Sequence, residues 1–160
     1  MEPANPYISV LVPASAGSGK TYQLSRRFIN LVAAGARPQD ILTLTFTVKA
    51  ANEMRSRIIA EATRLLVDKK RQEELTAEID NFHTEARSRY EKLNFRLQKP
   101  RSSQATAKAI LSATQSLQIT TIDAIFFDWV RKFPFEAQEK DASSVIFQPV
   151  LELSEPTQKK

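Results

Sequence analysis

The residues with the clearest chemical potential lie together in one short segment near the N-terminus. They are Ala14, Ser15, Ala16, Gly17, Ser18, Gly19, Lys20 and Thr21, and they include two of the three glycines among 160 residues. Glycine lets the backbone turn so that several N–H groups face one anion, and a following helix directs its first N–H groups to the same point. Lys20 could then reach the β- and γ-phosphates of a nucleotide, and the Thr21 hydroxyl could bind Mg²⁺. The spacing matches G-x-x-x-x-G-K-[ST] except for Ala14 and predicts a nucleotide phosphate site.

Two predicted elements position this segment. Residues 7–12, YISVLV, form a short apolar run that predicts a buried strand, which Pro13 ends. Apolar residues recur at helical spacing after the segment, so we expect a helix over 20–34. Gly35 stands where a left-handed C-terminal cap belongs. The order of strand, loop and helix is the one that a phosphate-binding loop requires.

A second strand and helix follow. Residues 41–46, ILTLTF, predict a strand parallel to the first, because the connection between the two contains a helix. Thr47 is expected to cap a helix over 48–67. The residues on one face of that helix are apolar or small: Ala51, Met54, Ile58, Ala62 and Leu65.

The region from 68 to 99 is charged and has a helical pattern. From Arg55 to Arg101 there are twelve Lys and Arg against eight Asp and Glu, which accounts for four of the five net positive charges. The pattern favours a solvated helix docked by a single face, and a basic arm near DNA is the alternative. His83 is the only histidine and there is no cysteine, which argues against a metal role for His83. The expected apolar stripe comprises Leu75, Ile79, Phe82, Ala86, Tyr90, Leu93 and Leu97.

The last third of the chain contains a further strand and two helices. Pro100 to Ser103 should end the charged helix, with Ser103 capping another. Residues 117–122 predict a third strand, and Asp123 is expected to cap an aromatic-rich helix over 124–133. The polar end of the segment 136–160 is expected to be disordered.

Composition excludes several classes of protein. The hydrophobic content of 42% is enough for a core, yet no run is long enough to cross a bilayer and no secretory signal is present. The absence of cysteine excludes disulfides, thiolate zinc sites and cysteine nucleophiles, and it suits a cytoplasmic protein. A net charge of +5 permits nucleic-acid binding without establishing it.

Three segments together carry a resemblance to a known family. They are ASAGSGKT at 14–21, ILTLTFTVKAANEMRSRI at 41–58 and ITTIDAIFFDWVRKF at 119–133. In this order they resemble the N-terminal ATP-binding region of UvrD-like superfamily-1 DNA helicases, and the likeness is strongest to the RecB/AddA branch, which acts in recombinational DNA repair. The second segment is the most specific, and the resemblance covers about residues 7–135.

The resemblance implies an α/β fold, with a P-loop (RecA-like) parallel sheet and helices on both of its faces. Here the sheet is expected to be incomplete and interrupted by a long helical insertion. The implied organisation has four parts: 1–67 as the first half of the P-loop core, 68–116 as the charged insertion, 117–135 as the third strand and helix, and 136–160 as a tail.

The resemblance also implies site residues and ligands. Residues 14–21 would bind ATP and Mg²⁺, with Lys20 and Thr21 as the catalytic residues and Thr21 as the magnesium ligand. Thr45, Phe46, Thr47 and Thr121 match motifs expected beside single-stranded or end-containing DNA, and Lys49 and Arg55 could add phosphate contacts. These residue types suit contact with DNA, because an aromatic ring can stack on a base and hydroxyl groups can bind phosphate. The implied partners are the remaining helicase domains or a nuclease–helicase partner protein.

Some of these positions have a second interpretation. Without the family, Phe46 would be interpreted as a core residue that ends a strand. Asp123 matches the third motif, but a carboxylate beside phosphate is unfavourable, so we assign it the capping role instead. Val48 and Ala124 replace polar residues that are frequent in the family, which weakens the expected DNA contacts.

ATP hydrolysis requires groups that this sequence lacks. The family uses an Asp-Glu pair at the end of a later strand and an arginine from a second motor domain, and no apolar run here ends in Asp-Glu. No glutamine precedes Ala14 to contact adenine. We therefore expect the N-terminal portion of a helicase that stops before its catalytic acid. The alternative is a stand-alone module that binds nucleotide, DNA or a partner without unwinding. A small phosphate-loop kinase would leave the second motif unexplained.

Overall fold

Most residues of the protein that can be placed are helical. The computed structural model describes residues 2–12, 19–93 and 97–132. The chain divides into two compact units, residues 1–125 and residues 126–160. The elements in chain order are α1 Lys20–Ala33, η1 Pro38–Asp40, β1 Thr43–Thr45, α2 Val48–Val67, α3 Lys69–Glu91, α4 Ser103–Ser112, η2 Thr114–Ser116, β2 Ile119–Thr121 and α5 Ile122–Lys132.

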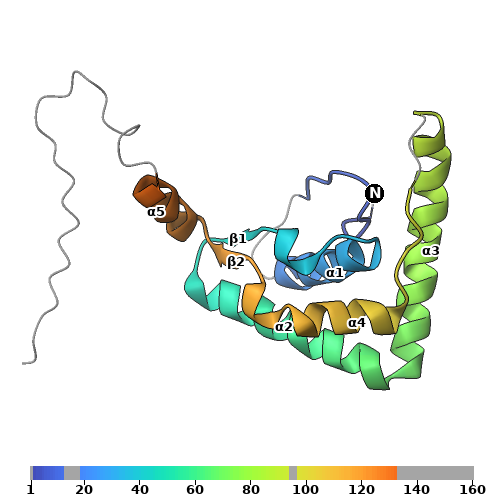
Figure 1. The fold of residues 1–160 in the computed structure, drawn as a ribbon, viewed down its shortest axis with the longest axis horizontal. Helices are drawn as coiled ribbons and strands as arrows, with labels where there is room; N and C mark the ends of the chain where they lie inside the picture. The colour runs from blue at the N-terminus through green and yellow to red at the C-terminus, as the bar shows by residue number, and fades with distance from the viewer. Residues whose placement is uncertain (1, 13–18, 94–96, 133–160) are drawn as a thin grey trace, which may run out of the picture. The chain divides into compact units, whose positions relative to one another are not determined.

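The two strands form a small parallel sheet at one end of the first unit. β1 pairs with β2 so that Thr43, Leu44 and Thr45 face Ile119, Thr120 and Thr121. Helix α2 contacts both strands and also packs against α1, α3 and α4. Figure 1 shows α2 running from the sheet to a sharp turn, where α3 begins and leaves in a different direction. The core lies between α1, α2, α3, α4 and β2, with Phe28, Met54, Ile58, Leu65, Leu75 and Ile110 among its buried residues.

The predicted strand over residues 7–12 is wrong, since none of these residues has strand structure. Two of their carbonyl groups bond to side chains instead of to a neighbouring strand. The Tyr7 carbonyl accepts a hydrogen bond from the Tyr90 hydroxyl at 3.2 Å, and the Ile8 carbonyl accepts one from Arg27 Nη2 at 2.6 Å. Leu11 is 95% exposed, so the run is also not buried as predicted. The parallel pair that forms joins β1 to β2, and both strands are shorter than predicted.

Helix α1 ends as the sequence predicts. Gly35 has φ 120°, a left-handed conformation that favours glycine. Its N–H donates to the Val32 carbonyl at 3.1 Å, and the Ala36 N–H donates to the Leu31 carbonyl at 3.0 Å. These two bonds define a Schellman motif and satisfy carbonyls that the helix leaves unpaired.

Helix α2 confirms both its predicted cap and its predicted apolar face. The Ala50 N–H donates to Thr47 Oγ1 at 3.1 Å, and the helix begins at Val48. The five residues predicted to share one face are all buried: Ala51, Met54, Ile58, Ala62 and Leu65.

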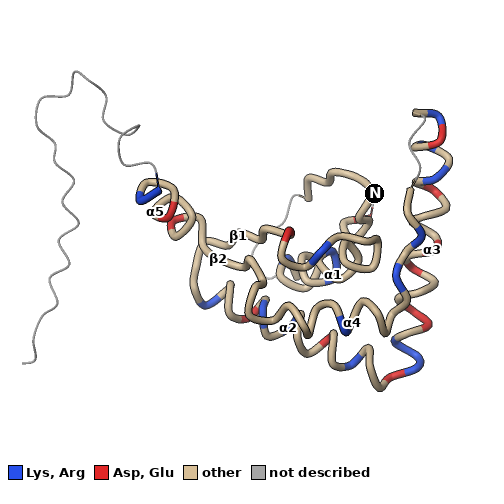
Figure 2. The backbone as a smooth tube through the Cα atoms, viewed as in Figure 1, with Lys and Arg blue, Asp and Glu red and all other residues tan. Residues whose placement is uncertain are grey.

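Helix α3 supports the docked interpretation of the charged region. Leu75, Ile79, Phe82 and Ala86 are buried, while Leu93 lies beyond the end of the helix and is exposed. The stripe is therefore shorter than predicted. Arg71 of α3 pairs with Glu61 of α2. Figure 2 shows positive and negative residues alternating along α3 instead of one continuous basic strip.

Two predicted helix caps lie one or two residues away from the observed caps. Ser102 caps α4 by accepting from the Ala105 N–H at 3.2 Å, whereas the Ser103 hydroxyl donates to the Gln72 carbonyl at 2.8 Å. Thr121 Oγ1 accepts from the Ala124 N–H at 3.2 Å, so Thr121 does the capping assigned to Asp123. Asp123 lies in the first turn of α5, where its charge still favours the helix dipole.

Candidate functional site

The glycine-containing segment enters α1 through a left-handed residue. Residues 14–18 of the predicted phosphate site, Ala14, Ser15, Ala16, Gly17 and Ser18, lie outside the described part of the chain. Gly19 has φ 74° and ψ 21° and is the N-cap of α1. A Cβ atom at Gly19 would meet nothing within 4 Å, so the backbone conformation is what requires glycine there.

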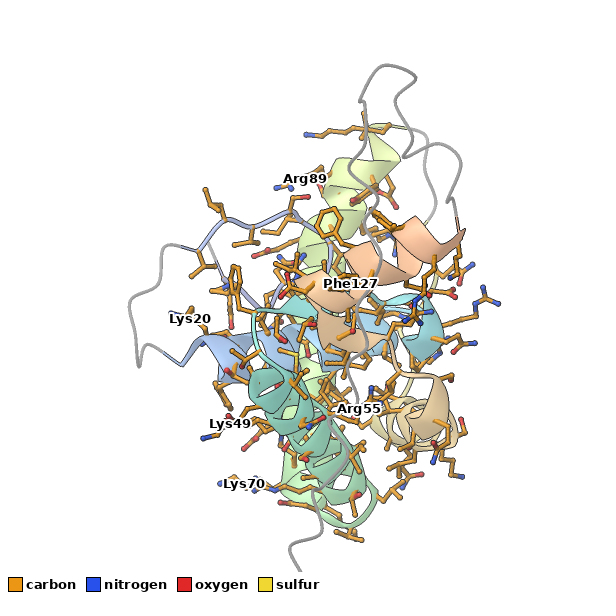
Figure 3. The ribbon with its side chains drawn as sticks, turned by 90° about the vertical axis from the view of Figure 1, so that its left-hand side faces the viewer. Lys20, Lys49, Arg55, Lys70, Arg89 and Phe127 are labelled. Carbon is orange, nitrogen blue, oxygen red and sulfur yellow. The ribbon has the colours of Figure 1, made fainter. Side chains whose placement is uncertain are left out.

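Lys20 and Thr21 are the first two residues of α1. Lys20 is exposed and points outward in Figure 3, whereas Thr21 is partly buried. The first turn of α1 carries no acidic residue, so no carboxylate there opposes an anion at the helix N-terminus. The N-terminus of α1 thus carries a lysine and no acid in its first turn, which is compatible with an anion there.

The predicted DNA-contacting residues lie at the carboxyl ends of the paired strands. Thr45 and Thr121 are partners in the β1–β2 register. Each strand leads into a helix capped by a threonine, Thr47 for α2 and Thr121 for α5. The Thr45 hydroxyl lies 3.0 Å from the Thr47 carbonyl and 3.4 Å from the Thr120 carbonyl, and it can donate to either. The structure thus brings together three residues from segments far apart in the sequence.

Phe46 and Lys49 project from this edge into solvent. Phe46 is 87% exposed, so the alternative interpretation of Phe46 as a core residue is wrong. Lys49 is exposed in the first turn of α2 and points outward in Figure 3. An exposed ring beside helix N-termini and a lysine has the features of a single-strand contact surface.

Arg55 does not belong to this surface. Its guanidinium donates to the carbonyls of Thr114, Leu117 and Ile119 at 3.1–3.3 Å. Arg55 therefore holds the entry to β2 against α2, and the phosphate contact suggested for it is replaced by a structural role.

Arg27 is a residue near the site that the sequence did not single out. Its Nη1 donates to the carbonyls of Pro3 and Asn5 at 3.1 and 2.6 Å, and its Nη2 donates to the Ile8 carbonyl. Nothing in the sequence distinguishes Arg27 from the other basic residues of α1. The role of Arg27 becomes visible only in the folded chain, where residues 3–8 lie against α1.

His83 has an aromatic partner and a polar partner. Its ring meets Tyr7 edge-on at 5.9 Å, and its Nε2 lies 3.1 Å from the Gln98 carbonyl. Burial, and then the negative charge of Asp80, raise the pKa of Tyr7, so this hydroxyl stays neutral at physiological pH. Within residues 2–12, 19–93 and 97–132, no group of three or more acidic or histidine side chains could hold a metal ion.

Three aspartates of the described residues have partners that suit structural roles. Asp40 pairs with Arg37 at 2.7 Å, and Asp128 pairs with Lys132 at 2.6 Å. Asp68 caps α3 through the Arg71 N–H at 3.1 Å. None of these three directly follows a strand of the sheet, whereas Asp123 comes two residues after the end of β2, in the first turn of α5.

Comparison with known proteins identifies the family of the chain. Residues 3–155 match the UvrD/REP helicase N-terminal domain, and the chain belongs to this family. This confirms the resemblance drawn from the three motifs. No solved structure gives a significant match.

Individual relatives are each named as a subunit of an ATP-dependent helicase/nuclease. The protein of Thermoanaerobacter sp. strain X514 is 51% identical over 63 residues, which are 38% of this chain and 5% of the relative. That of Lactobacillus helveticus is 47% identical over 55 residues, or 34% and 5%. That of Streptococcus pneumoniae strain Hungary19A-6 is 46% identical over 50 residues, or 31% and 4%. The matched stretches therefore span about a twentieth of these relatives.

Among the described helices, none has the length and apolar character needed to cross a membrane.

Proposed function

We propose that this chain is the ATP- and single-stranded-DNA-contacting portion of an ATP-dependent DNA helicase of the RecB/AddA type, acting in DNA repair and recombination. The chain's family membership supports the general class. The observation that carries the proposal is the convergence of Thr45, Thr47 and Thr121 beside exposed Phe46 at one edge of a parallel sheet. In open α/β sheets, ligands bind beyond the carboxyl ends of strands. The small parallel sheet fits a helicase N-terminal domain, and we further propose the P-loop (RecA-like) arrangement for it, although residues 7–12 do not form the strand that precedes the loop in that arrangement.

For the nucleotide, residues 14–21 surround the phosphates of ATP, with Lys20 and Thr21 in the central roles. The left-handed Gly19, the N-terminus of α1 and the absence of an acid in its first turn fit an anion. Lys20 would neutralise charge on the β- and γ-phosphates, and the Thr21 hydroxyl would hold Mg²⁺. These residues would orient the phosphoryl group that ATP–Mg²⁺ supplies when bound.

For DNA, the three threonines differ in whether their hydroxyl groups can still donate a hydrogen bond to a phosphate oxygen. Thr47 and Thr121 use a lone pair to cap their helices, so their hydroxyl protons remain able to donate to a phosphate oxygen. The Thr45 proton is directed to backbone carbonyls. Thr121 is 9% exposed, whereas Thr47 is open to solvent. Thr47, Lys49 and the Phe46 ring are therefore the principal contacts in this proposal.

For turnover, the proposal separates binding from hydrolysis. The sequence contains no Asp-Glu pair after an apolar run, so this chain alone binds ATP without efficient hydrolysis. The acid, the second motor domain and any nuclease partner would come from the rest of a helicase or from a partner protein. The alternative, a module that binds nucleotide, DNA or a partner without unwinding, uses the same residues. The cytoplasmic location stays a prediction.

The test measures both ligands on the 160-residue chain. We expect ATP–Mg²⁺ to raise the melting temperature and labelled single-stranded DNA to bind with an affinity that falls as salt rises. Lys20→Ala should abolish the nucleotide-dependent shift, whereas Lys70→Ala, at an exposed lysine of α3, should retain it. The absence of both responses in the unmodified chain would refute the proposed function. DNA-stimulated hydrolysis at a helicase-like rate, lost in Lys20→Ala, would refute the claim that the chain lacks catalysis.

A further inference from the structure

We infer that Arg27 is a positioning residue that ties the segment before the phosphate-binding residues to α1, and that helix α3 reinforces this tie. The inference rests on the proposed nucleotide site. It concerns residues 2–8, which lead into the glycine-containing segment, and α1, which leads out of it. Holding both flanks in place reduces the conformational freedom that phosphate binding must remove.

The first observation is the number of carbonyls that one guanidinium serves. Arg27 donates to Pro3, Asn5 and Ile8 at 3.1, 2.6 and 2.6 Å, and it is partly buried. Arginine presents several N–H donors in a rigid planar group, so one side chain can fix a bend in the backbone. The bond to Ile8 falls within residues 7–12, which lack strand pairing, and the other two bonds hold the residues just before them. Hydrogen bonds to a charged donor are also stronger than neutral ones.

The second observation is a buried polar link one turn further along α1. Asn30 is almost fully buried, and its Nδ2 donates to the Ala4 carbonyl at 3.0 Å and to Glu78 Oε1 at 2.8 Å. Glu78 belongs to α3 and also accepts from Arg26 Nη2 at 2.6 Å. Residues 2–8, α1 and α3 therefore share one hydrogen-bonded network.

The third observation is a direct contact from α3 to residues 2–8. The Tyr90 hydroxyl donates to the Tyr7 carbonyl at 3.2 Å, and the Tyr7 ring packs edge-on against His83. Tyr7 and Ile8 are thus adjacent residues held by different helices. Helix α3 therefore contacts the residues that precede the proposed nucleotide site, in addition to packing against the core.

The experiment compares two arginines that donate to backbone carbonyls: Arg27, in the middle of α1, bonds to residues 3–8, and Arg101 bonds to the C-terminal end of α1. Arg101 Nη1 donates to the Val32 and Ala36 carbonyls at 2.7 Å each, so Arg101→Ala removes similar bonds far from the N-terminus of the helix. Both Arg27→Ala and Arg101→Ala should lower the melting temperature. At a temperature where both variants are folded, only Arg27→Ala should weaken binding of a fluorescent ATP analogue with Mg²⁺, by about tenfold.

Two milder variants decide the question if Arg27→Ala does not fold. Arg27→Lys keeps the charge but cannot serve three carbonyls from a planar group, and Tyr90→Phe removes a single hydroxyl on α3. Each substitution should weaken binding of the ATP analogue by about two- to fivefold. Hydrogen exchange at residues 3–8 should rise in both variants and stay unchanged in Arg101→Ala.

The outcomes separate this inference from the proposed function. If the unmodified chain does not bind the analogue, the proposed nucleotide site is wrong. If the unmodified chain binds and the Arg27 variants bind equally well, or if Arg101→Ala weakens binding as much as they do, the positioning role is wrong. Unchanged binding and exchange in Tyr90→Phe would remove α3 from the inference.

Discussion

At the scale of single residues, the exposed edge of the sheet contains side chains with no evident packing role. Phe46 is largely exposed beside Thr47 and Lys49, while Phe28 on α1 is 2% exposed in the core. The same residue type therefore stands in two different environments in this chain. Exposure is what distinguishes them, because burial of apolar surface is the main source of folding free energy.

The two phenylalanines provide a matched pair of substitutions. Phe46→Ala should change the free energy of unfolding by less than about 0.5 kcal/mol, and it should weaken single-stranded DNA binding by about 1–3 kcal/mol. Phe28→Ala should lower the free energy of unfolding by about 3–5 kcal/mol. Denaturant titration and fluorescence anisotropy measure the two effects. Normal DNA affinity in Phe46→Ala would exclude a stacking role for Phe46.

Gly19 allows a test of backbone conformation without steric conflict. Because no atom lies within 4 Å of a Cβ built there, Gly19→Ala should cost only the left-handed conformation, about 1–2 kcal/mol. Asparagine tolerates this conformation better, so Gly19→Asn should be the milder change. Thermal unfolding with and without ATP–Mg²⁺ gives the comparison. Equal stability of the Ala and Asn variants would contradict the argument.

At the scale of elements, the helices begin and end where side chains bond to free backbone groups. Thr47, Ser102 and Asp68 each accept from a backbone N–H three residues further on. Asp68 also ends α2, so one residue is both the C-cap of α2 and the N-cap of α3, the two longest helices. This makes the junction sensitive to the charge of a single carboxyl group.

Asp68 predicts a defined pH dependence. Its bond from the Arg71 N–H, and then its bond from the Arg64 guanidinium, lower its pKa below the ordinary 3.8. A lowered pKa in the folded state stabilises the protein above pH 3.8, and the contribution disappears as pH falls through the folded-state pKa. Asp68→Asn keeps a capping oxygen but cannot titrate. The stability difference between the two proteins should shrink from pH 6 to pH 3 in denaturant titrations. A constant difference would contradict this assignment.

At the scale of the whole molecule, the first unit has a well-covered helical core and a poorly covered sheet. Ile58, Leu65 and Ile110 are fully buried, while Leu42, just before β1, and Leu44, within β1, are exposed. Within the described residues, each strand has one neighbour, so each also has an open edge. The four-part division into 1–67, 68–116, 117–135 and 136–160 stays a prediction.

The exposed sheet predicts concentration-dependent self-association of this chain. Open strand edges with apolar side chains favour pairing with another molecule. Replacing Leu42 and Leu44 with Thr should reduce association without lowering the melting temperature, whereas Val67→Thr, at an exposed position at the end of α2, should leave association unchanged. Light scattering during size-exclusion chromatography measures the self-association as a function of protein concentration. A monomer at every concentration would show that the edge is protected.

The sequence by itself determined the helical framework and the family. Periodicity, together with Gly35 and Thr47, placed α1 and α2, since helix signals act over a few residues and survive in any context. The three motifs identified the helicase family for the same reason, because each is a continuous stretch of chain.

The tertiary structure alone decided which distant residues meet. It paired Thr45 with Thr121, gave the carbonyls of residues 3–8 to Arg27 and directed Arg55 to the entry of β2. It also left residues 7–12 without the strand structure that their composition predicts. Strand pairing and side-chain bonds to backbone carbonyls join residues far apart along the chain, so no local pattern indicates them.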